Sequence, residues 1–144
     1  MILIIRVRGK IGIRKEVKDT FAMLRLPRNY SCVLLPETPV YKGMIKKVKD
    51  YSMYGSISES VLKDLLMKRL KRKDKKPVDA KLVDKIIKVL NDNKLLKDVE
   101  EVIPTISLHP PIKGFRRGGT KKTVKQGGDL GKHDSMDELV KKMM

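Results

Sequence analysis

Side chains that commonly perform catalysis or bind metal ions are scarce in this chain. Cys32, His109 and His133 are its only cysteine and histidines, and no two of them lie at a spacing typical of zinc sites. Cys32 stands in an apolar run, where a free thiol is usually buried and unreactive. The sequence contains no local Ser-His-Asp or Cys-His pattern. We therefore predict no metal, no cofactor and no enzymatic activity.

A glycine-rich stretch at residues 127–133 (GGDLGKH) has the composition of a phosphate-binding loop but lacks its pattern. A P-loop would require glycine where Gln126 stands, and serine or threonine where His133 stands. Gly9 and Gly12 lack the third glycine of a dinucleotide-binding fingerprint. We expect no nucleotide or other small-molecule substrate.

Positive charge is the feature that indicates a partner. The chain has 34 Lys and Arg against 17 Asp and Glu, which gives a net charge of +17. Such a charge repels itself within a compact chain unless a polyanion neutralises it, and nucleic acid is the commonest polyanion. An anionic membrane is the rival partner, but the apolar run at residues 1–5 is far too short to span a bilayer. The single cysteine fits a reducing cytosol, so we expect a cytoplasmic protein.

The candidate RNA-binding residues gather in three places. Arg6 and Arg8 lie two apart and share one face of a strand, and lysines line one side of a helix at residues 39–51. The stretch at residues 113–132 combines cations with glycines, which let the backbone approach phosphates, and with an aromatic ring that can stack on a base. The predicted RNA-binding residues are Arg6, Arg8, Lys10, Arg14, Lys42, Gly43, Lys46, Lys49, His109, Lys113, Phe115, Arg116, Arg117, Lys121, Lys122, Lys125, Gly127, Gly128 and Lys132.

Hydrophobic periodicity predicts the elements that must position these residues. The first 58 residues indicate strand, helix, strand, helix, strand, at residues 1–8, 15–25, 30–35, 39–51 and 52–57. Thr38-Pro39 predicts the start of the second helix, with threonine as N-cap and proline in the first turn.

The remainder, residues 59–144, is predicted to be a helical and loop extension. Its elements are helices at 59–71 and 79–92, a short strand within 101–108, a basic glycine-rich loop at 109–134 and a terminal helix at 135–143. The run at residues 71–76 (KRKDKK) indicates a solvated linker. Ser135 and Glu138 have the spacing of a capping box for the terminal helix, and its apolar stripe is Met136, Leu139, Val140 and Met143. Because that helix is apolar on one side, we expect the loop to be anchored at both ends. The composition of the loop itself predicts that it cannot bury enough apolar surface to become ordered alone.

Four motifs carry a resemblance to a known family. They are IRVRG at residues 5–9, ETPVYKGM at 37–44 (followed by Val48 and Tyr54-Gly55), LHPPIKGF at 108–115 and QGGDLG at 126–131. In this order they resemble the family of large-subunit ribosomal protein thirty, called protein seven in eukaryotes. The long C-terminal part resembles the archaeal form, because bacterial members are only about as long as the first 58 residues.

The resemblance implies a small antiparallel three-stranded sheet with two helices, similar to a ferredoxin-like fold, plus an extension. It implies ribosomal RNA as ligand, close to the five-S RNA and to neighbouring ribosomal proteins, without cofactor or reaction. Ser107 departs from the pattern, since relatives often have arginine there. The functional residues that the resemblance implies are Arg6, Arg8, Gly43, His109, Lys113, Phe115, Gly127 and Gly128.

We therefore predict an α+β protein with an RNA-binding core at residues 1–58 and an extension at 59–144. The expected function is that of a structural constituent of the large ribosomal subunit, which binds and stabilises ribosomal RNA in the cytoplasm. A chromatin-type DNA-binding protein is the alternative, because it would share the charge. An enzyme acting on RNA is the third hypothesis.

Overall fold

The computed structural model describes residues 1–74, 77–91 and 95–144 and shows an α+β fold. Its first part runs β1 (Ile2–Arg6), α1 (Lys15–Met23), β2 (Ser31–Leu35), α2 (Pro39–Val48) and β3 (Ser52–Ser56). The predicted order of strands and helices is confirmed, with element ends that differ by a few residues. The remaining elements are α3 (Glu59–Arg69), α4 (Ala80–Asn91), η1 (Leu96–Asp98), β4 (Ile106–Ser107), η2 (Val124–Gln126), β5 (Gly131–Ser135) and α5 (Asp137–Met143).

The start of α2 follows its sequence signal. The side chain of Thr38 accepts a hydrogen bond from the backbone N–H of Tyr41 at 3.5 Å, and Pro39 occupies the first turn. Proline is tolerated there because its missing N–H has no partner within the helix. Ile45 and Val48 are buried on the inner side of α2, which leaves the lysine side of the helix turned outward.

The sheet has five strands in the order β4-β2-β1-β3-β5, so the expectation of a three-stranded antiparallel sheet is wrong. β1 pairs antiparallel with β2 and β3 as expected, but the extension adds one strand to each edge. β4 pairs antiparallel with β2, whereas β5 pairs parallel with β3, which makes the sheet mixed. A three-stranded sheet would expose unpaired N–H and C=O groups along both edges, and the added strands cover part of them.

Gly55 permits the junction between β3 and β5. A Cβ at this position would lie 2.4 Å from the carbonyl oxygen of His133. Only glycine lets the two backbones approach so closely without displacement. The sheet therefore crosses the expected boundary at residue 58, because a strand of the extension pairs with a strand of the first part.

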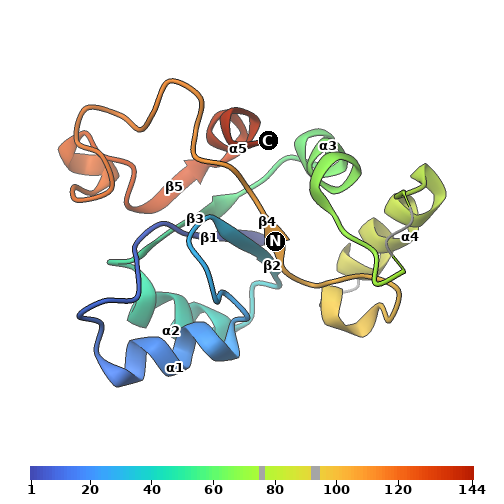
Figure 1. Ribbon diagram of the computed structural model, residues 1–144, viewed down its shortest axis with the longest axis horizontal. Helices are drawn as coiled ribbons and strands as arrows, with labels where there is room; N and C mark the ends of the chain where they lie inside the picture. The colour runs from blue at the N-terminus through green and yellow to red at the C-terminus, as the bar shows by residue number, and fades with distance from the viewer. Residues whose placement is uncertain (75–76, 92–94) are drawn as a thin grey trace.

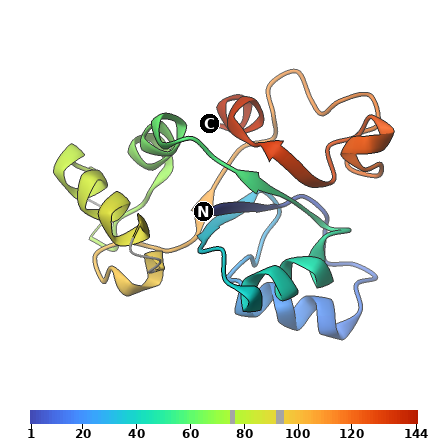
Figure 2. The same ribbon diagram turned by 180° about the vertical axis from the view of Figure 1, so that it is seen from behind.

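Helices cover both faces of the sheet (Figures 1 and 2). α1 and α2 lie on one face and pack on Ile4, Val33 and Leu35. α3 and α5 lie on the other face with Leu3 and Ile5, and α4 packs against α3 away from the sheet. Alternate residues of β1 thus supply two separate cores, as the period of a strand requires.

Three expectations for the extension need correction. The segment at 109–134 is not all loop, because it contains η2 and most of β5. Ser135 belongs to β5 and does not form the predicted capping box; α5 begins at Asp137, whose backbone N–H donates to the Ser135 hydroxyl at 3.3 Å. Within the linker, Arg72 is largely buried and forms ion pairs with Asp79 and Glu101 at 3.6 and 3.8 Å, while Lys75 and Lys76 lie outside the described residues. The apolar stripe of α5 packs inward as predicted.

Candidate nucleic-acid interface

Arg6 is buried and holds neighbouring backbone segments together by hydrogen bonds. The prediction that its side chain binds RNA is therefore corrected. Its side chain is 3% exposed and donates three hydrogen bonds of 3.0–3.1 Å to the carbonyl oxygens of Arg8, Leu26 and Gly9. Its guanidinium carbon lies 4.3 Å from the ring centre of Phe21. Burial lowers the pKa of Arg6 from its ordinary value, yet an arginine stays charged at neutral pH. The charged hydrogen bonds offset the cost of removing this cation from water.

The other cations near the end of β1 are accessible. Arg8 is half-buried, donates to the backbone oxygen of Asp50 at 3.0 Å and lies 5.8 Å from the Tyr51 ring centre. Lys10 and Arg14 are exposed in the loop that connects β1 to α1. Ile11 at the tip of this loop is fully exposed. The loop therefore presents an apolar tip between two cations.

A basic groove lies beside α2. Lys42 and Lys46 of α2 line one side of a hollow of about 510 Å³, and Lys132 of β5 lines it from the sheet. Tyr54 of β3 is the direct pairing partner of Lys132, so both side chains stand on the same face of the sheet. A second hollow of about 250 Å³ continues past Lys49 and Lys125 and shares Tyr54 and Lys132 with the first. We call the two hollows together the lysine groove.

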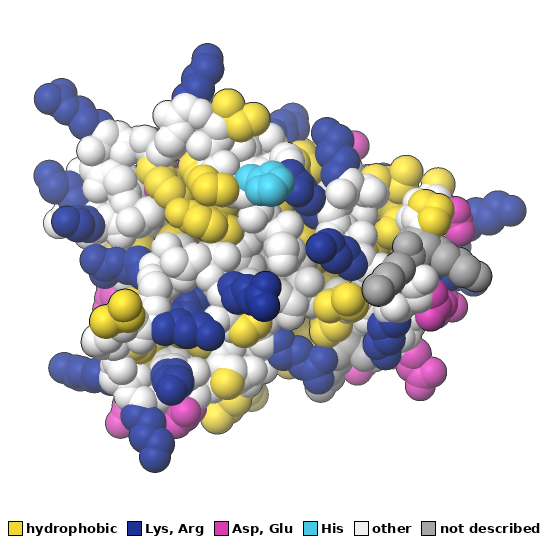
Figure 3. All heavy atoms as spheres, viewed as in Figure 1, with side chains coloured by type: hydrophobic (Ala, Val, Ile, Leu, Met, Phe, Trp, Pro, Cys, Tyr) yellow, Lys and Arg dark blue, Asp and Glu magenta, His cyan; other side chains and the backbone are white. Residues whose placement is uncertain are grey.

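Acidic groups only partly offset the charge of the lysine groove. Glu37 accepts a hydrogen bond from the Met1 amino group at 3.0 Å and lies 3.8 Å from the Lys42 amine. The amino group is the main reason that the pKa of Glu37 is lowered, so this carboxylate is ionised and already paired at neutral pH. Lys46, Lys49, Lys125 and Lys132 form no ion pair within the described part of the chain. Figure 3 shows Lys and Arg side chains spread across one face of the molecule, with few acidic ones among them.

Some polar groups of the glycine-rich segment at residues 113–132 form contacts within the segment itself. Asp129 is 2% exposed, accepts from the backbone N–H of Arg116 at 2.7 Å and lies 3.4 Å from the Arg116 Nε. A Cβ at Gly128 would lie 2.0 Å from the backbone oxygen of Lys122, so this glycine is required by packing inside the segment. Packing and hydrogen bonds within the segment thus give it local order that its composition does not predict. The RNA-binding role of Gly128 stays a prediction.

Among the other residues predicted to bind RNA in this part of the chain, some already contact other side chains and some are exposed. Phe115 stacks on Tyr30 with ring centres 6.4 Å apart and planes at 20°, so one ring face already has a partner. Gly127 has a φ of +79°, a conformation that glycine adopts without strain. His109 is exposed, with its Nε2 2.9 Å from a nitrogen of Arg69. The remaining exposed cations are Lys113, Arg117, Lys121 and Lys122.

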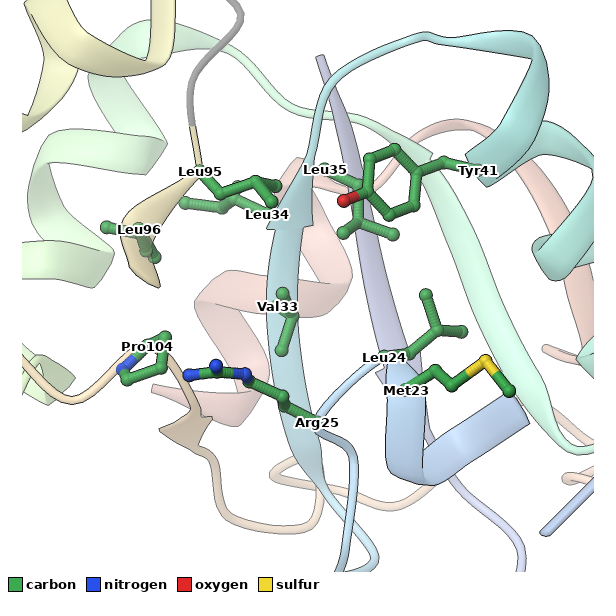
Figure 4. Close-up of a pocket in the computed structure, with 10 residues that line it drawn as sticks. All are labelled: Met23, Leu24, Arg25, Val33, Leu34, Leu35, Tyr41, Leu95, Leu96 and Pro104. Carbon is green, nitrogen blue, oxygen red and sulfur yellow. The ribbon is translucent and has the colours of Figure 1, made fainter. Parts of the chain in front are cut away.

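An apolar hollow at the β2 edge contrasts with the lysine groove (Figure 4). It measures about 160 Å³ and lies between α1, β2 and the segment around η1. Leu24, Leu34 and Leu95 are among its lining residues, and Arg25 is the only charged one among those that the structure describes. A polyanion would find little to bind there. The lysine groove is therefore the better candidate for nucleic acid.

Metal binding and membrane insertion can be checked for the described residues. No group of three or more His, Cys, Asp or Glu side chains could hold a metal ion within the described ranges. No helix among them is long and apolar enough to cross a membrane. Cys32 is buried, as predicted, and burial raises the pKa of its thiol.

Comparison with known proteins gives the decisive observation. A family model described as "Ribosomal protein L30p/L7e" matches residues 2–51. The large ribosomal subunit protein uL30 of Methanococcus vannielii is 40% identical over 151 residues, which cover 98% of this chain and 97% of the relative. The corresponding protein of Methanothrix thermoacetophila is 37% identical over 156 residues, with 99% of each chain covered. This chain belongs to the uL30 family.

Membership in the uL30 family confirms the resemblance inferred from the four motifs, including the archaeal form of the extension. The similarity continues well past the residues matched by the family model, so the extension is part of what the archaeal relatives share. The comparisons give no support to the DNA-binding alternative.

Sequence reasoning missed two residues that organise the interface of this uL30-family chain. Tyr54 was noted only as part of a motif, although it lines both hollows of the lysine groove. Asp129 is the only acidic residue in the sequence from 113 to 132, a sign that could have marked it as an internal partner for Arg116. A single carboxylate surrounded by cations is more easily buried than one among other acids.

Proposed function

We propose that this protein is a structural, non-enzymatic constituent of the large ribosomal subunit and binds ribosomal RNA there, in the cytoplasm. The observation that carries the proposal is the lysine groove. Cations from α2 and from a segment about eighty residues later in the chain converge on one channel. Five lysines and three acidic residues (Glu37, Asp50 and Asp134) line the two hollows. This excess of positive charge favours a polyanionic ligand, and the names of the relatives favour ribosomal RNA.

The mechanism is neutralisation and fixation of folded RNA. Phosphates along the groove are bound by five lysines, and each contact releases counterions from the RNA. These lysines are Lys42, Lys46, Lys49, Lys125 and Lys132. Exposed residues around the groove extend the contact: Arg8, Lys10, Arg14, Lys113, Arg117, Lys121, Lys122 and His109. Gly43 is exposed on α2 with open space where a Cβ would stand, so RNA can approach the helix backbone there.

The fold of the first part and the location of the bound RNA can be proposed in more detail. The part of the fold from β1 to β3 is proposed to be a ferredoxin-like core, since its strand and helix order is β-α-β-α-β with β1 in the middle. The RNA bound is proposed to lie near the five-S RNA, with neighbouring ribosomal proteins alongside. Phe115, Arg116 and Gly127 are also proposed to bind RNA; Arg116 and Gly127 are exposed, and Phe115 is half-buried.

Cross-linking in intact cells, followed by sequencing of the attached RNA, tests the function. We expect the cross-links to fall in large-subunit ribosomal RNA. Cross-links mainly to messenger RNA, to transfer RNA or to DNA would contradict the proposal.

A competition experiment with purified protein separates RNA from DNA. Structured ribosomal RNA should displace a labelled RNA fragment at much lower concentration than duplex DNA of the same charge. The logarithm of affinity should fall linearly with the logarithm of salt concentration, by about 0.7 to 0.9 per neutralised phosphate. A flat salt dependence would contradict binding through phosphates.

A further inference from the structure

We propose that the lysine groove holds a single extended RNA strand, with Tyr54 on its floor stacked against an unpaired base. This inference rests on the proposed function, because it specifies which form of RNA this surface binds. It assigns a role to Tyr54, which carries no charge, and it sets the groove apart from a general basic surface.

The floor of the groove exists because the two helices leave the outer strands uncovered. The core beneath α1 and α2 is built from β1 and β2, with Ile4, Val33 and Leu35 fully inside it. Tyr54 of β3 only borders that core, and Lys132 of β5 stands beyond it, exposed. The outer part of this sheet face is therefore open, and Tyr54 and Lys132 are paired there on neighbouring strands whose backbones lie about 5 Å apart.

Cations flank this floor on two sides. Lys42, Lys46 and Lys49 come from α2, and Lys125 comes from η2 across the groove. The two hollows share Tyr54 and Lys132 among their lining residues, so Tyr54 borders both of them. A chain of phosphates along the channel would pass amines on both sides while its bases faced the sheet.

The position of the Tyr54 ring selects a single strand. In an RNA duplex the bases are stacked and paired inside the helix, and protein side chains reach mainly phosphates and sugars. A ring at the bottom of a channel meets a base only if that base is unpaired and turned out. Aromatic rings between cations are the usual means of binding single strands with little sequence preference. Burial raises the pKa of Tyr54, so the phenol stays neutral and does not repel phosphate.

The test compares single-stranded with duplex RNA on the full chain. The probes are a fluorescent oligouridine of twelve nucleotides and a blunt RNA duplex with the same number of phosphates. Tyr54→Leu removes the ring but keeps an apolar side chain against the core. Tyr54→Phe keeps the ring. Tyr41→Leu is the matched control, because Tyr41 borders the same core but does not line the groove.

We expect Tyr54→Leu to weaken oligouridine binding about tenfold, with the salt dependence unchanged, because stacking does not involve counterions. Tyr54→Phe and Tyr41→Leu should stay within about twofold of the native affinity, and duplex binding should change little in all three. Lys132→Ala should weaken oligouridine binding and reduce the salt slope by about 0.7. Circular dichroism confirms that each variant is folded.

Two failures can be told apart. If the native chain binds neither probe nor structured ribosomal RNA, the proposed function fails. If it binds ribosomal RNA but Tyr54→Leu leaves oligouridine affinity unchanged, or weakens duplex binding equally, only the single-strand inference is overturned.

Discussion

Arg6 and Lys132 stand on the same face of one sheet, but Arg6 is buried and Lys132 is exposed. Arg6 on β1 lies beneath α1, against Phe21, with its nitrogens held by backbone carbonyls. Lys132 on β5 lies beyond the reach of the helices and faces an open groove. The difference shows that the distance of a strand from the covering helices decides whether a cation is buried within the fold or left exposed. Net charge alone does not make this distinction.

The largest expected effect comes from removing the buried cation. Arg6→Met leaves three carbonyl oxygens without their donor, one of them buried and two partly buried. A buried unsatisfied group costs roughly 1–3 kcal/mol, and the contact of the cation with Phe21 is lost as well. We expect the free energy of unfolding to fall by about 3 kcal/mol or more, measured by urea denaturation. Lys132→Met, the control, should change it by less than about 0.5 kcal/mol. Equal effects of the two substitutions would break the comparison.

Gly128 tests the same contrast within the glycine-rich segment. Gly128→Ala places a Cβ against the backbone of Lys122, which cannot rotate away as a side chain could. We expect a loss of about 2 kcal/mol in stability, by analogy with overpacked sites. Thermal unfolding followed by circular dichroism measures it. A melting temperature equal to the native one would contradict the packing role of Gly128.

Two neighbouring arginines in that segment should separate stability from binding. Arg116→Glu places a second carboxylate beside the buried Asp129, so we expect stability to fall by about 1–2 kcal/mol. Arg117→Glu changes an exposed residue and should cost less than about 0.5 kcal/mol, while it weakens RNA affinity by replacing attraction with repulsion. Urea denaturation and RNA titration of both variants give the comparison. The reverse order of stabilities would contradict the role of Arg116.

The smallest effect is expected at Gly43. Gly43→Ala has open space for its methyl group, and alanine is favoured in a helix by about 1 kcal/mol. We expect a gain in stability of up to that amount, with reduced RNA affinity because the methyl group keeps the RNA backbone away from α2. Unchanged affinity would make Gly43 a tolerated helix defect without a binding role.

Local sequence predicted the elements whose pattern is apolar and periodic. The helices from α1 to α5 have stripes such as Met136, Val140 and Met143, and β1 and β2 are runs of aliphatic residues. β5 was missed because its sequence, GKHDS, is polar and has no strand propensity. Its conformation comes from hydrogen bonds to β3, a partner far away in the chain that local pattern does not reveal.

Only part of the candidate site could be predicted, because local pattern does not reveal which distant strands pair. The lysine side of α2 followed from helical periodicity, but its meeting with Lys125 and Lys132 depends on where β5 joins the sheet. Arg6 was predicted to bind RNA because of its charge, although its place in the strand indicates burial. Ile4 and Arg6 share a strand face, and the burial of Ile4 under α1 extends to its neighbour.

The parallel strand β5 also bears on how this chain can be made. During synthesis from the N-terminus, β1, β2 and β3 can pair early, because all three lie within the first 56 residues. The outer edge of β3 must then wait until residues 131–135 have been added, and until that moment it offers free N–H and C=O groups to any other extended chain. Pairing across so long a separation also slows the final step of folding. A nascent chain halted before Gly131 would therefore hold the first three strands in place and still be prone to associate through β3.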